Sequence, residues 1–150
     1  MRTAIGLLLA LVLFLVTACG GGGGAKRLSH ADFVSKGNAI CVAASGAIDQ
    51  LGDPASLADV ARIGAKLATI RDDETSKLAA LKPAQDDEAG QTTLIDALRA
   101  RNKTLHSVVT AARKHDQAAA SKALAAGQPL GDKASNAALD LGLLRCAEGG

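Results

Sequence analysis

The scarcity of aromatic side chains limits how this chain can build a core. The sequence contains two Phe residues and no Tyr or Trp, and Phe33 is the only one of them beyond the apolar N-terminal segment. The rest of the core must therefore come from Ala, Leu, Ile and Val. These residues recur along most of the chain at intervals of three and four, which is typical of amphipathic helices. Because no stretch alternates with a period of two, no strand is expected.

Helix start and stop signals divide the region after residue 28 into segments. Ser29 and Asp32 have the spacing of a capping box, and Asp53 followed by Pro54 is typical of a second helix start. Gly142 suits the position just after the last helix. We expect an all-α fold, a small antiparallel bundle of four to five helices with two long members. The expected helices span about 29–51, 54–82, 86–114, 116–127 and 130–141, with Pro129 separating the last two.

The first 18 residues have the pattern of a lipoprotein signal peptide. Arg2 supplies one positive charge, residues 4–16 are apolar, and the small-residue site Val16-Thr17-Ala18 precedes Cys19. A membrane-spanning helix needs roughly 20 apolar residues, so this segment is too short to cross the bilayer. We expect cleavage after Ala18 and acylation of Cys19, for example with palmitate. The alternative is a plain secretory signal in which the cysteine is incidental.

An acylated Cys19 would place the protein on the extracytoplasmic face of the cell membrane. Two or three acyl chains anchor a protein stably, whereas one chain binds only marginally. The glycine run at 20–24 continues into a basic pair at 26–27, which makes residues 19–28 a flexible linker. Such a linker has a root-mean-square reach of about 15 Å. Residues 29–150 then form one bundle domain.

Charge and motifs exclude several classes of protein. The net charge of +2 is too small to indicate a nucleic-acid partner. Catalytic and phosphate-binding motifs are missing, so we expect no enzyme, no metal and no cofactor. His30, His106 and His115 lack the acidic spacing of a di-iron bundle and are interpreted as surface or structural. The acidic runs 72–74 and 86–88 could be taken for a divalent-ion site, but solvated helix surface is the favoured interpretation.

Cys41 and Cys146 are predicted to form a disulfide. Export would bring the domain into an oxidising compartment, and acylation of Cys19 would leave these as the only two thiols. Two isolated cysteines with no paired histidines do not make a zinc site. The alternative is a pair of buried free thiols. If the bond forms, the two Cα atoms should lie within about 7 Å.

Three segments resemble a group of small secreted or lipid-anchored helical proteins common in actinobacteria. They are Asp32-Phe33 followed by Gly37-Asn38-Ala39-Ile40-Cys41, the turn Leu81-Lys82-Pro83-Ala84-Gln85-Asp86-Asp87, and Leu141-Gly142-Leu143-Leu144-Arg145-Cys146. Many members carry two prolines in the central turn, where this chain has Lys82-Pro83. The resemblance covers nearly the whole chain after the signal and implies no activity, because the group is functionally uncharacterised.

Two functions from different classes are consistent with the sequence. The first is a membrane-anchored envelope lipoprotein that is not an enzyme and acts as an interaction or structural module for an unknown envelope protein. The second is a carrier or sensor whose aliphatic core opens to admit a small apolar ligand. Small residues such as Gly37, Ala44, Gly64 and Ala68 would allow such opening but suit close helix packing equally well. A tightly packed core would count against the carrier.

Overall fold

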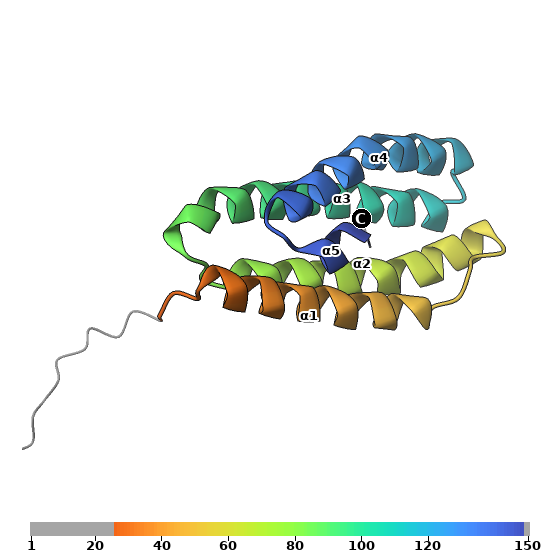
Figure 1. The fold of residues 1–150 in the computed structure, drawn as a ribbon. Coiled ribbons are helices and arrows are strands. Elements are labelled where there is room, and N and C mark those ends of the chain that lie inside the picture. Colours follow the sequence, from red (N-terminus) through yellow and green to blue (C-terminus); the bar gives the residue numbers. More distant parts are fainter. Residues whose placement is uncertain (1–25, 149–150) are drawn as a thin grey trace, which may run out of the picture.

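A computed structural model describes residues 26–148, and these residues form an all-helical bundle with no strand among them. Figure 1 shows α1 and α2 side by side as one layer, with α3 and α4 as the other. The short α5 packs against both α1 and α4 and lies between them. Successive long helices are antiparallel, as the sequence predicts. The elements are α1 (His30–Asp49), α2 (Leu57–Ala80), a 3-10 turn (Gln85–Asp87), α3 (Glu88–Arg113), α4 (Gln117–Asp140) and α5 (Leu144–Glu148).

The helix caps explain most of these boundaries. Ser29 caps α1, because its hydroxyl oxygen accepts a hydrogen bond from the backbone N–H of Asp32 at 3.1 Å. The prediction that Asp53 and Pro54 begin α2 is wrong. Ser56 is the cap instead, and its oxygen accepts from the backbone N–H of Asp59 at 3.1 Å. This second Ser-x-x-Asp box satisfies the first turn of the helix.

α4 is one helix of 24 residues, although the sequence predicts two helices divided at Pro129. A proline inside a helix removes one backbone hydrogen bond and crowds the preceding turn. Pro129 is exposed, so water can reach the carbonyl that this proline leaves without a donor. On the opposite side, α4 lies so close to α3 that a Cβ added at Gly127 would come within 2.9 Å of Thr104 Oγ1. Packing against α3 therefore continues the helix through the proline.

The main core lies where α5 closes the bundle. Its largest fully buried side chains are Phe33, Leu78, Leu94, Leu143 and Cys41. Leu143 follows Gly142, whose φ of +74° turns the chain back after α4. Gly37 gives Leu143 its space, because a Cβ at Gly37 would lie 2.5 Å from Leu143 Cδ2. The segment after Gly142, for which the sequence predicts no helix, thus forms α5 and supplies Leu143 to the centre of the core.

The N-terminal end of the described chain is fastened to the turn between α2 and α3. The backbone N–H of Leu28 donates to the carbonyl of Lys82 at 2.7 Å. Arg27 forms an ion pair with Glu88 and donates to the Pro83 carbonyl at 3.3 Å. The chain therefore enters the bundle at one fixed end, and α1 runs away from that point (Figure 1).

Candidate functional site

The site residues that the sequence predicts lie in two parts of the chain. Val16, Thr17, Ala18 and Cys19 lie outside the described residues, so the cleavage and acylation sites stay predictions. Cys41 on α1 and Cys146 on α5 are joined as a disulfide, with their Cα atoms 5.1 Å apart. The predicted pairing and its Cα separation are confirmed. The bond joins the first and last helices of the bundle.

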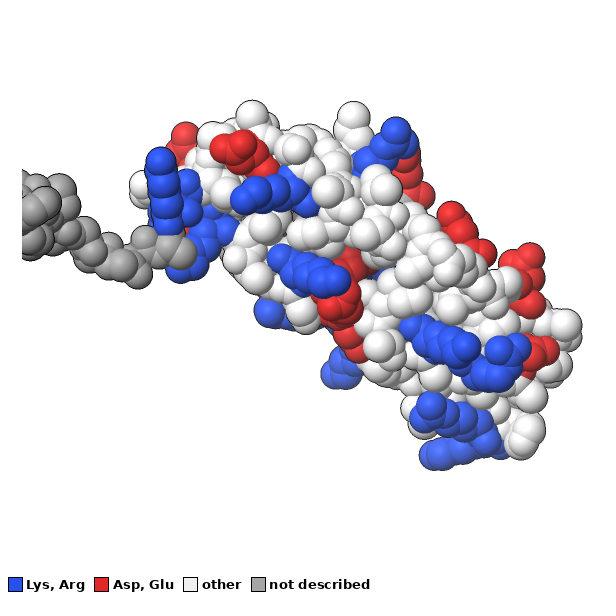
Figure 2. Space-filling model, turned by 90° about the horizontal axis from the view of Figure 1, so that it is seen from below, with Lys and Arg blue, Asp and Glu red and all other residues white. Residues whose placement is uncertain are grey.

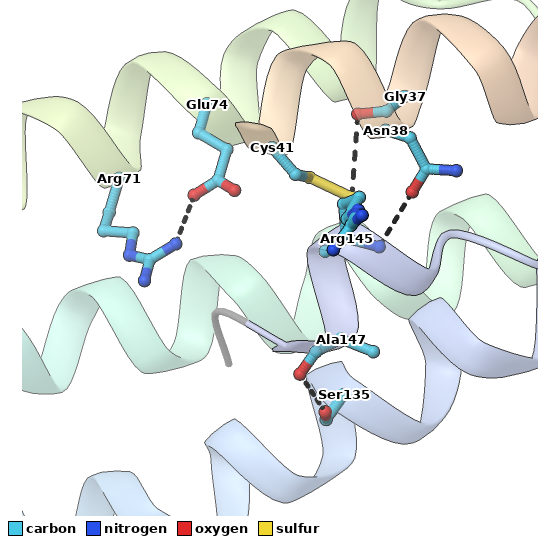
Figure 3. Close-up of a disulfide and its surroundings, with 9 residues drawn as sticks. Gly37, Asn38, Cys41, Arg71, Glu74, Ser135, Arg145 and Ala147 are labelled. Atoms are coloured by element: carbon cyan, nitrogen blue, oxygen red, sulfur yellow. Dashed lines mark hydrogen bonds and ion pairs between the residues drawn. A yellow bond between two sulfur atoms is a disulfide. The ribbon is translucent and has the colours of Figure 1, made fainter. Parts of the chain in front are cut away.

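Hydrogen bonds hold α5 in place around this disulfide (Figure 3). The side-chain oxygen of Asn38 accepts from the backbone N–H of Arg145 at 2.9 Å, next to the start of α5. The hydroxyl of Ser135 on α4 donates to the Ala147 carbonyl at 2.7 Å. The Cys146 sulfur carries no proton in the disulfide and lies 3.7 Å from the Gly37 carbonyl oxygen. Three helices thus meet at the cysteine pair.

A shallow groove of about 600 Å³ lies beside the disulfide. The C-terminal half of α1 forms one wall, and α2 and α5 supply charged side chains. Arg145 and Glu148 pair with each other across one turn of α5 at 2.8 Å. The groove is open to solvent rather than enclosed, and its charged groups are of both signs. Its lining residues are Val42, Ser45, Gly46, Ile48, Asp49, Arg71, Arg145 and Glu148.

A polar layer, which we define as Arg71, Glu74, Arg101 and Asn102, is formed by α2 and α3 next to this groove, which Arg71 also lines. Glu74 is buried, with 4% of its surface exposed, and accepts from Arg71 Nη1 at 2.9 Å. Arg101 is half-buried. Burial, followed by the nearby Arg71 charge, lowers the pKa of Arg101, and Glu74 opposes this shift. Nη2 of Arg101 and Oδ1 of Asn102 are buried without a hydrogen-bond partner among the described atoms.

Asp72 connects this layer to the surface. Its two carboxylate oxygens contact α3, one accepting from Asn102 Nδ2 at 3.0 Å and the other lying 2.8 Å from His106 Nε2. Asn102 Nδ2 also donates to Thr75 Oγ1 at 3.1 Å. The prediction that residues 72–74 are solvated helix surface is wrong for Glu74, which is buried, but right for Asp72, whose side chain is 48% exposed. It also holds for Asp73, which is exposed and pairs with Lys77 at 2.6 Å.

The sequence carries a signal for this layer that the prediction overlooked. Glu74 lies four residues after Ile70 and four before Leu78, in the middle of the apolar face assigned to the second helix. Residues four apart share a helix face, so an acid at this position indicates a buried partner. Arg71, three residues earlier, supplies it.

The histidines lie at the surface, as predicted, and two of them form pairs. His30 Nδ1 lies 3.0 Å from the carboxylate of Asp87, and its side chain is 60% exposed. His106 contacts Asp72 as described above. His115, in the turn between α3 and α4, adopts φ of +56°, a left-handed conformation uncommon outside glycine. Within residues 26–148, no group of three or more His, Cys, Asp or Glu side chains could hold a metal ion.

The outward side of α1 has no helix packed against it. We define the α1 face as Ala39, Val42, Ala43 and Gly46, which are exposed and share one side of the helix. Val42 is 54% exposed, and Leu144 on the neighbouring α5 is 57% exposed. The only charged residues near the α1 face on this helix are Lys36 before it and Asp49 after it. In Figure 2, which looks onto the side of α1 and α2, a broad uncharged area lies among charged side chains.

Comparisons with protein-family models, with curated protein sequences and with solved structures give no match. The resemblance to actinobacterial secreted helical proteins therefore stays a prediction. In the part of the chain that the structure describes, no helix is long and apolar enough to span a bilayer.

Proposed function

We propose that this protein is a lipid-anchored lipoprotein on the extracytoplasmic face of the cell membrane. It acts there as a non-enzymatic interaction module rather than as a catalyst. The observation that carries this proposal is a rigid bundle fastened at its entry point, with an apolar helix face left open to solvent. The anchor itself rests on Val16-Thr17-Ala18-Cys19.

The entry point supports a tethered module. Because Leu28 is bonded to Lys82 and Arg27 to Pro83, the predicted linker 19–28 would meet the bundle at the α2–α3 turn through its last two residues. α1 begins at His30, two residues after Leu28, and extends away from that turn for 20 residues. At 1.5 Å per residue this is about 30 Å. The α1 face would therefore stand clear of the lipid headgroups.

The packing counts against the alternative of an apolar-ligand carrier. Neighbouring side chains occupy the space beside the two glycines that might let helices separate: a Cβ at Gly64 would lie 2.9 Å from Val109, and one at Gly37 would lie 2.5 Å from Leu143. Four hollows among the described residues are open grooves with charged or polar linings. Native mass spectrometry of the purified protein tests this point, and a co-purified lipid of defined mass would favour the carrier.

Fatty-acid labelling tests the anchor. Cells that express the full chain are grown with an alkyne analogue of palmitate, and the protein is isolated and tagged. We expect the wild type to be labelled and Cys19→Ala to lose the label. The matched control is the double variant Cys41→Ala/Cys146→Ala, which removes two cysteines but keeps the acylation site. Label that persists in Cys19→Ala would contradict the proposal.

A further inference from the structure

Basic residues are concentrated in the second half of α3 and the turn that follows it. Residues 97–115 contain five Lys or Arg residues and no Asp or Glu. The rest of the described chain holds 11 basic and 15 acidic residues. The bundle therefore carries an excess of positive charge along one helix and an excess of negative charge elsewhere.

Four of these five basic residues form one surface, which we define as the α3 ridge: Arg99, Lys103, Arg113 and Lys114. All four are exposed. With 3.6 residues per turn, they fall within an arc of about 100° around the helix axis. At 1.5 Å per residue they extend over about 22 Å. The α3 ridge is thus a basic strip along one side of α3.

The fold leaves the charge of the α3 ridge almost without a partner. Within the described residues three of its members form no ion pair, and Arg99 has only Asp96, at 3.8 Å. The carboxylate of Asp72, which reaches α3 from α2, is already held by Asn102 and His106. A partner that brings negative charge would offset the repulsion among the cations of the ridge.

The chain enters the bundle beside the helix that carries the ridge. Arg27 pairs with Glu88, the first residue of α3, and Leu28 is bonded to Lys82 in the turn before it. Figure 1 shows this entry point and the start of α3 at the same end of the bundle. Arg99 follows Glu88 by 11 residues, which is about 16 Å along the helix. The reach of the linker, about 15 Å, is of the same size, so an anchored bundle can lay α3 along the bilayer.

We propose that the α3 ridge binds the anionic headgroups of the bilayer that holds the anchor, with α3 lying along the membrane surface. This inference rests on the proposed lipid anchor. Each Lys or Arg near an anionic surface favours contact about fivefold, so four of them together orient the bundle. α1 packs against α2 and α5 rather than on the ridge side of α3. The α1 face therefore stays clear of the headgroups in this orientation.

Quenching by labelled headgroups tests the orientation. The lipid-anchored full chain is purified with Thr110→Cys, an exposed position within the α3 ridge, and separately with Val42→Cys on α1. With Cys19 acylated and the disulfide formed, the introduced cysteine is the only free thiol and takes a fluorescent label. Each protein is reconstituted into phosphatidylcholine vesicles with or without phosphatidylglycerol, in which part of the phosphatidylcholine carries a nitroxide quencher on its headgroup. We expect strong quenching at position 110 in the anionic vesicles only, and little at position 42 in either.

Charge variants separate attraction from structure. Lys103→Gln/Arg113→Gln should lower the ratio of contacting to free orientations about 25-fold, because two fivefold contributions are lost. Lys103→Arg/Arg113→Lys keeps both charges and should keep the quenching. Lys122→Gln/Lys133→Gln, on the exposed side of α4, is the matched control for net charge and should change nothing. Salt at 1 M shortens the Debye length to about 3 Å and should remove the quenching without releasing the anchor.

Three results would overturn the inference: equal quenching at positions 110 and 42 in anionic vesicles, quenching at 110 that does not need phosphatidylglycerol, and quenching that the double Gln variant of the ridge leaves unchanged. Binding of soluble polyphosphate while position 110 stays unquenched on anionic vesicles would also overturn it, because the ridge would then serve a soluble polyanion. Failure of the anchor is seen separately. Protein without acyl chains would not float with phosphatidylcholine vesicles in a density gradient.

Discussion

Two regions of the bundle are filled by different kinds of side chain. One is the part of the core that α5 closes, and the other is the polar layer next to it. In the first, Phe33, Leu94 and Leu143 pack with almost no exposure. In the second, Glu74 and Asn102 are equally buried but depend on hydrogen bonds from α2 and α3. Apolar contacts tolerate small shifts, whereas hydrogen bonds do not. The first region supplies stability, and the second fixes how α2 lies against α3.

The largest effect is expected from the disulfide, which belongs to the region closed by α5. The bond links residues 105 apart, and a closed loop of that size stabilises a fold by about 4–5 kcal/mol in the chain-entropy model. Cys41→Ser/Cys146→Ser should lower the free energy of unfolding by up to that amount, as measured by urea denaturation. Reducing agent should destabilise the wild type and leave the double variant unchanged. Equal stability of the oxidised and reduced wild type would contradict this.

The next effect tests the polar layer. Glu74→Ala removes the buried carboxylate that pairs with Arg71 at 2.9 Å, and breaking a buried pair in this way costs about 3–5 kcal/mol. Asp73→Ala is the matched control, because it removes the neighbouring ion pair with Lys77, which is exposed and is worth about 0.5 kcal/mol. Urea denaturation of both variants at pH 7 measures the difference. Similar losses in the two would mean that Glu74 is not held in a buried pair.

Gly37→Ala should disturb the core less strongly. Its Cβ would come within 2.5 Å of Leu143, so the leucine must shift inside a packed region. Overpacking of this kind costs about 1–3 kcal/mol. Thermal unfolding followed by circular dichroism provides the measurement. An unchanged melting temperature would show that the region closed by α5 has more room than the contact implies.

Gly46→Ala, on the opposite side of the same helix, should have the smallest effect and the opposite sign. The new methyl group meets nothing, and alanine favours a helix over glycine by about 1 kcal/mol. The melting temperature should therefore rise. A decrease would mean that Gly46 has a role within the single bundle.

The sequence predicts the first three helices and their order well, because caps and apolar spacing are local signals. Ser29, the acidic start of α3 and Gly142 are all confirmed in their roles. The errors arise where a distant contact outweighs a local rule. Pro129 predicts a break, but packing of α4 on α3 overrides it. α5 is too short to be stable alone, and it exists because the disulfide, Asn38 and Ser135 hold it.

The candidate site could be predicted only in part. The cysteine pair follows from counting thiols, since two remain after acylation of Cys19. The α1 face was overlooked because apolar spacing indicates which residues gather on one side but not which side meets the core. The buried residues of α1 are Phe33, Gly37, Cys41 and Ala44, whereas Ile40 and Ile48, which are larger and apolar, are only partly buried. Exposure of Val42 depends on where α2 and α5 pack, which is tertiary information.

The disulfide has a consequence for how the chain would survive proteolysis. The three turns that connect the long helices, at 50–56, 81–84 and 114–116, all lie between Cys41 and Cys146. Exposed turns are the usual sites of nicking by proteases. A single cut in any of them would leave two fragments that stay covalently joined. Because residue 26 belongs to the N-terminal fragment in every case, a nicked bundle would not release its C-terminal piece from whatever holds the N-terminus.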